Sequence, residues 1–206
     1  MCDIPEDKLR TIKAWKVADK LLFSCFTDYS WKVDVGSILT YVQSDEHNIY
    51  YVRSGVVEIA DNCFDSTFRQ IVLSKSVKRI GVSAFESCET LENINLENIE
   101  TIDSWAFMGC VKLRNVELPL LKELGTGVFQ DCDSLEYIEI PLVKKICAYT
   151  FDSCLRLRVA RLPEVELIET RAFSQCNNLS RVEVKNSCAF SKQSFMDTKA
   201  RIHFVI

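Results

Sequence analysis

Hydrophobic and polar positions repeat along the chain with a period of 22 residues. Six phenylalanines set this period: Phe85, Phe107, Phe129, Phe151, Phe173 and Phe195. A cysteine follows each of the first five by three residues: Cys88, Cys110, Cys132, Cys154 and Cys176. Leucine, isoleucine and valine recur at other fixed offsets, so that the unit reads LxxIxLPxVxxIxxxAFxxCxx. A fixed period of this length predicts one small structural unit stacked on copies of itself.

Each part of the unit predicts a different element. LxxIxL alternates apolar and polar residues, which predicts a short strand that ends at Pro119, Pro141 or Pro163. VxxI is too short for a helix and predicts a second short extended stretch. AFxxC has apolar residues at i, i+1 and i+4, which predicts one turn of α or 3₁₀ helix that places Phe and Cys in the core. The stacked units predict a solenoid of about seven turns with short parallel strands.

This unit resembles the BspA-type leucine-rich repeat, also called the Treponema-pallidum-type repeat, over residues 56–206. The AF and Cys columns, with the LP pair that closes the strand, carry the resemblance. It implies a right-handed, arc-shaped solenoid and brings no catalytic residues. The family occurs mainly in anaerobic bacteria and parasitic protists. Its members are often cell-surface adhesion or interaction proteins.

The segment before the repeats is less regular. Residues 38–42 and 49–52 are apolar runs around a polar stretch, and they predict that residues 35–55 form a capping hairpin over the open end of the first coil. Residues 1–34 form an N-terminal extension. Its apolar residues over 6–26 approximate a helical stripe, which predicts a helix. That helix would serve either as a further cap or as a partner-binding element.

Composition and charge narrow the classes of function. The 206 residues carry a formal net charge of −4, and the basic residues do not cluster along the sequence, which argues against nucleic-acid binding. The sequence shows no long apolar run of membrane-spanning length and no secretory signal. Five of the ten cysteines fall in one repeat column, which predicts reduced packing thiols rather than disulfides. Together these features favour a cytoplasmic location.

The sequence predicts no catalytic residues, no cofactor and no metal site. The two histidines, His47 and His203, stand in no spacing typical of a metal site or a catalytic triad. The chain contains no CxxC pair, which argues against a zinc or redox motif. It also lacks a phosphate-binding glycine loop and a nucleophile elbow.

The candidate binding residues are the outward strand positions between the fixed columns. Eight of them are predicted to form a protein-binding surface: Asn93, Asn115, Glu117, Tyr137, Glu139, Val159, Arg161 and Arg181. Tyr137, Val159 and Arg161 would form a mixed aromatic, apolar and basic patch. Tyrosine and arginine are the residue types that most often anchor interfaces.

Two functions fit this combination of features. The first is a non-enzymatic scaffold inside the cell, a monomer that binds protein partners within a larger assembly of cytoskeletal or axonemal type. The alternative, which the family resemblance implies, is a cell-surface adhesion or interaction protein. Such a protein would have to reach the surface by unconventional export. An enzyme would need a deep pocket with converging polar groups, and the sequence predicts none.

Overall fold

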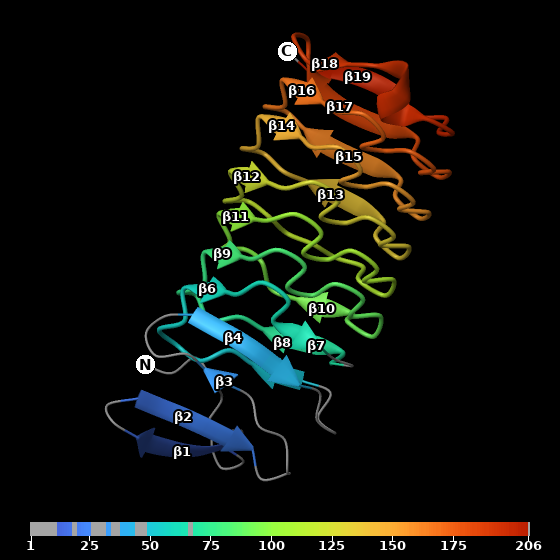
Figure 1. Ribbon diagram of the computed structural model, residues 1–206. Helices are drawn as coiled ribbons and strands as arrows, with labels where there is room; N and C mark the ends of the chain where they lie inside the picture. The colour runs from blue at the N-terminus through green and yellow to red at the C-terminus, as the bar shows by residue number, and fades with distance from the viewer. Residues whose placement is uncertain are drawn as a thin grey trace.

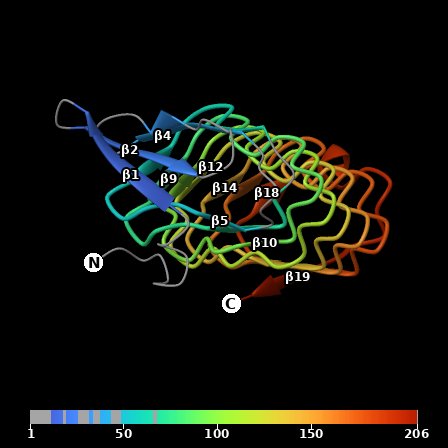
Figure 2. The ribbon, with the colours of Figure 1, turned by 90° about the horizontal axis from the view of Figure 1, so that it is seen from below.

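The chain folds as a stack of about seven coils that runs from β4 at one end to β18 and β19 at the other (Figure 1). The computed structural model describes residues 12–17, 20–25, 32–33, 38–43, 49–65 and 68–205. Each coil passes along a first sheet, along a second sheet and through a turn that carries the repeated phenylalanine, although residues 115–118 form no strand. Seen along the stack, the coils lie over one another around a shared interior (Figure 2). The predicted parallel-stranded solenoid is thus confirmed.

The LxxIxL segments form the first sheet. Its strands are β5 (Ile49–Tyr51), β8 (Gln70–Val72), β10 (Asn93–Ile94), β13 (Tyr137–Glu139), β15 (Val159–Leu162), β17 (Arg181–Lys185) and β19 (Arg201–Val205). Paired neighbours run parallel and in register. Inward residues such as Ile138 and Ala160 are fully buried, whereas the alternate residues face outward. This alternation is the period-two pattern that the sequence predicted.

The VxxI segments form the second sheet together with strands from the N-terminal region. Its strands are β3 (Lys32–Val33), β4 (Ile38–Gln43), β6 (Glu58–Ile59), β9 (Arg79–Ile80), β11 (Thr101–Ile102), β12 (Glu123–Leu124), β14 (Lys145–Ile146), β16 (Leu167–Ile168) and β18 (Ala189–Phe190), and β7 (Phe64–Asp65) pairs with β4. Each repeat contributes its Ile or Leu to the interior, as with Ile102 and Ile146. A second core wall therefore faces the first sheet.

The phenylalanine turns close the third side of each coil. Phe107 and Phe129 are fully buried, and their ring centroids lie 5.5 Å apart with the planes within 9° of parallel. The same turns are joined by backbone hydrogen bonds: the Phe107 N–H donates to the Val128 carbonyl at 2.9 Å, and the Phe129 N–H donates to the Thr150 carbonyl at 2.8 Å. Each phenylalanine thus fills the core with its side chain and links two coils with its backbone.

The AFxxC segment is not the helical turn that the sequence predicted. The Cys110 N–H does donate to the Phe107 carbonyl at 3.2 Å, which closes a single turn. The residues two before and two after each phenylalanine from Phe85 to Phe173, however, take positive φ angles, such as +58° at Trp105 and +74° at Gly109. Left-handed residues on both sides stop a helix from continuing. Among the described residues, only the last turn, η1 (Lys192–Phe195), is a 3₁₀ helix.

The ladder cysteines form a buried column beside the rings. Each thiol from Cys110 to Cys176 donates to the carbonyl of the phenylalanine one coil earlier, at 3.2 Å for Cys110 and 3.0 Å for Cys176. The eight cysteines whose side chains are described are free thiols. Burial raises the pKa of the Cys110 and Cys154 thiols well above the ordinary value, and that of Cys176 to about 12. These cysteines therefore act as small packing residues, as the sequence predicted.

Both sheets are interrupted at the same level of the stack. Within the described residues, β12 and β14 are not paired, and the backbone of residues 115–118 makes no hydrogen bond with β10 or β13. The coils that carry Phe129 and Phe151 are consequently joined by backbone bonds on the phenylalanine side alone. Their ring centroids are 5.7 Å apart, compared with 4.9 Å between Phe85 and Phe107. We call this junction the seam.

The N-terminal region differs from both predictions. The helix expected over residues 6–26 is wrong where the structure describes it, because β1 (Ile12–Val17) and β2 (Lys20–Cys25) are antiparallel strands. The capping hairpin over residues 35–55 is also wrong, because β4 and β5 do not pair with each other. Instead β4 pairs parallel with β6 and β7, and β5 pairs parallel with β8. The backbone N–H and C=O groups at the edges of the first repeat are therefore paired by β4 and β5, which continue its two sheets.

The seam provides a test of the phenylalanine column. Phe129→Ala is expected to lower the free energy of unfolding by about 3–5 kcal/mol, because it opens a cavity where no sheet joins the two coils. The matched control, Phe204→Ala, removes a ring that is 51% exposed and should cost less than about 1 kcal/mol. Urea unfolding followed by circular dichroism measures both. An equal loss of unfolding free energy in the two variants would show that the Phe129 ring is not part of the stabilising core.

The thiols provide a second test, this time of burial. At about pH 8, iodoacetamide should modify the half-buried Cys147 at least about tenfold faster than Cys110 or Cys132, because the raised pKa and burial of the latter leave almost no accessible thiolate. Peptide mass spectrometry of samples taken over time gives the individual rates. The unfolded protein in urea is the control, in which the rates should converge. Equal rates in the folded protein would refute the packing role.

Candidate interaction surface

The outward side chains of the first sheet form two columns along the stack. Parallel pairing places Tyr137, Val159, Arg181 and Arg201 side by side in one column. The second column contains Glu139, Arg161, Glu183 and His203. We call this surface the outer sheet face. Five of the eight sequence-predicted binding residues lie in these two columns. Gln70 and Asn93 are paired in the same way and form a separate stretch of the first column on the N-terminal side of residues 115–118.

Tyr137 and Arg161 form the centre of the outer sheet face. An Nη1 hydrogen of Arg161 is donated to the Tyr137 hydroxyl at 3.1 Å, and the guanidinium carbon lies 5.6 Å from the centre of the ring. The Tyr137 hydroxyl donates in turn to Glu139. Partial burial and this hydrogen bond raise the pKa of Tyr137, so the phenol remains a neutral donor. The aromatic ring is held in place by its neighbours and is still 38% exposed.

Glu183 joins the two arginines of this centre. Its carboxylate lies 3.3 Å from Nε of Arg161 and 2.8 Å from Nε of Arg181. Glu183 is mostly covered, whereas both guanidinium groups are about half exposed. A single carboxylate therefore orients two arginines and leaves part of their positive charge facing solvent. Exposed ion pairs of this kind contribute little to stability, but they fix the direction of side chains.

A hollow of about 540 Å³ at the C-terminal end of the same face is basic. Its lining contains three basic residues, Arg181, Lys199 and Arg201, together with His203, and no carboxylate. Arg181 and Arg201 are neighbours in register, although they are far apart in sequence. Sequence reasoning found no basic cluster because the parallel register, not the sequence spacing, brings these residues together.

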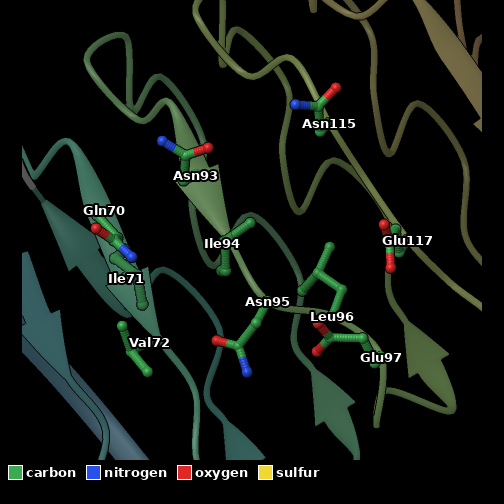
Figure 3. Close-up of a pocket in the computed structure, with 10 residues that line it drawn as sticks. All are labelled: Gln70, Ile71, Val72, Asn93, Ile94, Asn95, Leu96, Glu97, Asn115 and Glu117. Atoms are coloured by element: carbon green, nitrogen blue, oxygen red, sulfur yellow. The ribbon is translucent and has the colours of Figure 1, made fainter.

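The N-terminal half of the face has a different character, which follows from the interruption of the first sheet. Residues 115–118 lie between two hollows of about 300 and 380 Å³. Figure 3 shows the first of these hollows, with the amides of Gln70, Asn93 and Asn115 in a row along one side. Tyr137 and Glu139 line the second hollow together with Asn115 and Glu117. Five of the sequence-predicted binding residues thus border the interruption: Asn93, Asn115, Glu117, Tyr137 and Glu139.

Like charges in the second column act against pairing at one part of the interruption, between residues 115–118 and β13. Glu117 and Glu139 occupy equivalent positions in successive repeats, and a paired sheet would place them side by side. Like charges directly opposite each other disfavour pairing. Glu139 instead accepts a hydrogen bond from Tyr137, and Glu117 is exposed without an ion pair among the described residues. Sequence reasoning identified both residues but did not predict that the segments carrying them would stay unpaired.

A metal or membrane role gains no support from the described part of the chain. Within it, no group of three or more His, Cys, Asp or Glu side chains is arranged to hold a metal ion. His203 lies on the outer sheet face, and His47 falls outside the described residues. None of the described helical residues makes a helix long and apolar enough to cross a membrane.

Comparison with known families agrees with the repeat geometry. The sequence profile of the BspA type leucine rich repeat region matches residues 44–158 in six copies. The chain belongs to this family. The match begins within the stretch assigned above to a cap, which agrees with the parallel pairing of β5 with β8. No curated protein matches the chain by sequence.

Several solved structures share this leucine-rich repeat fold. The leucine rich repeat protein of T. pallidum is 26% identical with a TM-score of 0.67, over 88% of this chain and 84% of that one. A leucine rich cell surface protein from Faecalibacterium prausnitzii is 18% identical with a TM-score of 0.61, over 85% of this chain and 55% of that one. The pneumococcal vaccine antigen PcpA is 20% identical with a TM-score of 0.65, over 82% of this chain and 44% of that one. The last two likenesses concern the fold alone.

The centre of the outer sheet face should be dispensable for folding. Arg161→Ala removes the contacts to Tyr137 and Glu183, but all of them are at the surface, so the urea midpoint should match that of the wild type. The near-ultraviolet circular dichroism of tyrosine should change, because the ring loses its cation neighbour. A large drop in the midpoint would show that these side chains hold the sheet together rather than serve recognition.

Proposed function

We propose that the chain is a non-enzymatic protein-interaction module of the cell-surface adhesion type, which binds a protein partner through the outer sheet face. Family membership supports an interaction role, since leucine-rich repeats of this type are interaction scaffolds. Two neighbours in fold, described as a cell surface protein and a vaccine antigen, support the surface setting. The intracellular, cytoskeletal or axonemal setting favoured by the sequence gains no such support.

One observation carries the proposal: the fixed cluster of Tyr137, Arg161, Arg181 and Glu183. Tyrosine and arginine dominate the binding energy of interfaces because they combine large contact area with directed hydrogen bonds. Here both are oriented before binding, so little conformational entropy is lost when a partner docks. The cluster lies on strands of the scaffold rather than on loops, which keeps its geometry constant.

The proposed partner is a different protein rather than a second copy of this chain. The outer sheet face changes from neutral and acidic residues near Asn115 to basic residues near Arg201, a gradient that fits any surface with the opposite gradient, including a second copy turned end for end, and the mass of the crosslinked product described below separates the two cases. With a different protein as partner, the chain acts as a monomer within a heterologous complex.

A site-specific crosslink tests both the face and the setting. A photoreactive amino acid at Val159 should crosslink the protein, added to intact cells of the source organism, to one partner of distinct mass. The same group at Leu167, which is 39% exposed on the second sheet, is the matched control and should not. Protease treatment of intact cells should remove the endogenous protein.

Two results would overturn the proposal. Equal crosslinking from Val159 and Leu167 would exclude recognition by the outer sheet face. An endogenous protein that survives protease on intact cells and is lost only after lysis would exclude the surface setting and favour the intracellular scaffold.

A further inference from the structure

The hollow beside residues 115–118 carries unused hydrogen-bonding groups. The side-chain amides of Gln70, Asn93 and Asn115 stand in a row above it, and none of the three makes a hydrogen bond within the described protein (Figure 3). Asn95, by contrast, uses its amide fully: it accepts from the Leu73 N–H at 2.7 Å and donates to the Leu73 carbonyl at 3.0 Å. Three of the four side-chain amides that line this hollow thus have no partner among the described residues.

The backbone adds further unused groups. The N–H and C=O groups of residues 115–117 and the Leu118 N–H have no backbone partner in the described structure, whereas the Leu118 C=O accepts from the Leu121 N–H at 3.4 Å. The side chains of Val116 and Leu118 are 5% and 1% exposed, so this backbone lies close to the core. Backbone polar groups in such a position need water or a ligand as partners. The interruption of the sheet thus supplies donors and acceptors along one side of the hollow.

The charge of the lining restricts the class of ligand. Among the residues that line this hollow, Glu97 and Glu117 are acidic and none is basic, which disfavours a phosphate, a sulfate or a carboxylate. A side-chain amide offers two donors and an acceptor oxygen, whereas a carboxylate is an acceptor only. Hydroxyl groups both donate and accept, so a ligand rich in hydroxyls uses the amides, the carboxylates and the free backbone at once.

We propose that this hollow binds a neutral oligosaccharide that lies along the Gln70, Asn93 and Asn115 row. Gln70 and Asn93 lie on paired strands, which are about 4.8 Å apart, and Asn115 follows one coil further on, so the row presents one amide per coil to a ligand that is itself a linear repeat of similar rings. This site is separate from the Tyr137 and Arg161 cluster assigned to the protein partner.

The experiment titrates ¹⁵N-labelled protein with neutral hexasaccharides of glucose, mannose, galactose and N-acetylglucosamine. At least one should shift the side-chain amide signals of Asn93 and Asn115 and the backbone signal of Val116. The fitted affinity should stay constant between about 50 and about 500 mM NaCl, because no ion pair forms. A heparin hexasaccharide and a lysine hexapeptide are the charged comparisons.

Matched variants locate the site. Asn93→Asp with Asn115→Asp keeps the size of both side chains but removes their donors, and it should weaken binding at least about tenfold. Asn177→Ala, an exposed amide in the basic hollow, should leave the affinity unchanged. Thermal melts of all variants confirm that the fold is retained.

Three outcomes would overturn the inference. The first is that no hexasaccharide shifts these signals. The second is that a hexasaccharide binds the double variant as tightly as the wild type. The third is that only the lysine peptide binds, with an affinity that falls steeply as the salt concentration rises. The last result would assign the hollow to a basic peptide held by Glu97 and Glu117. None of these outcomes bears on crosslinking from Val159, which tests the protein-binding cluster independently.

Discussion

The stacking of one phenylalanine per coil is the interaction on which the rest of the fold depends. Rings such as Phe107 and Phe129 lie nearly parallel and fully buried, and the backbone on either side of each ring is fixed by left-handed residues and by hydrogen bonds to the next coil. The two sheets and the thiol column are placed relative to this stack. Where both sheets are interrupted, the phenylalanine side alone keeps the coils in register.

The periodic part of the fold could be predicted because each repeat column has the same environment in every coil. The burial of Phe151 and Cys154, and the outward direction of Tyr137 and Arg161, follow from position within the unit. The N-terminal region could not be predicted in this way. Short apolar runs such as residues 12–17 fit a helix or a strand equally well, and only pairing decides between them.

The candidate surface was predictable as a set of outward positions but not as a set of sites. The sequence cannot show that Arg161 lies over the Tyr137 ring, that Glu183 holds two arginines, or that Arg181 and Arg201 are neighbours. Each of these contacts depends on register between coils. The missing pairing between residues 115–118 and β13 is a further example, because the two carboxylates that act against it, Glu117 and Glu139, are 22 positions apart in the sequence. The result is one face with a neutral hollow, an aromatic and arginine centre, and a basic end.

The seam also has a mechanical consequence. A stack whose coils are bonded on all three sides resists bending in every direction, whereas the coils of Phe129 and Phe151 are bonded through their backbone on one side only. A tilt between the two halves at this junction would break no backbone hydrogen bond of either sheet and would leave those on the phenylalanine side in place. Such a tilt changes the distance between the amide row and the arginine cluster without breaking either one. The seam is thus the junction, among the described coils, where backbone bonding constrains the two halves least, and it lies between the two proposed binding sites.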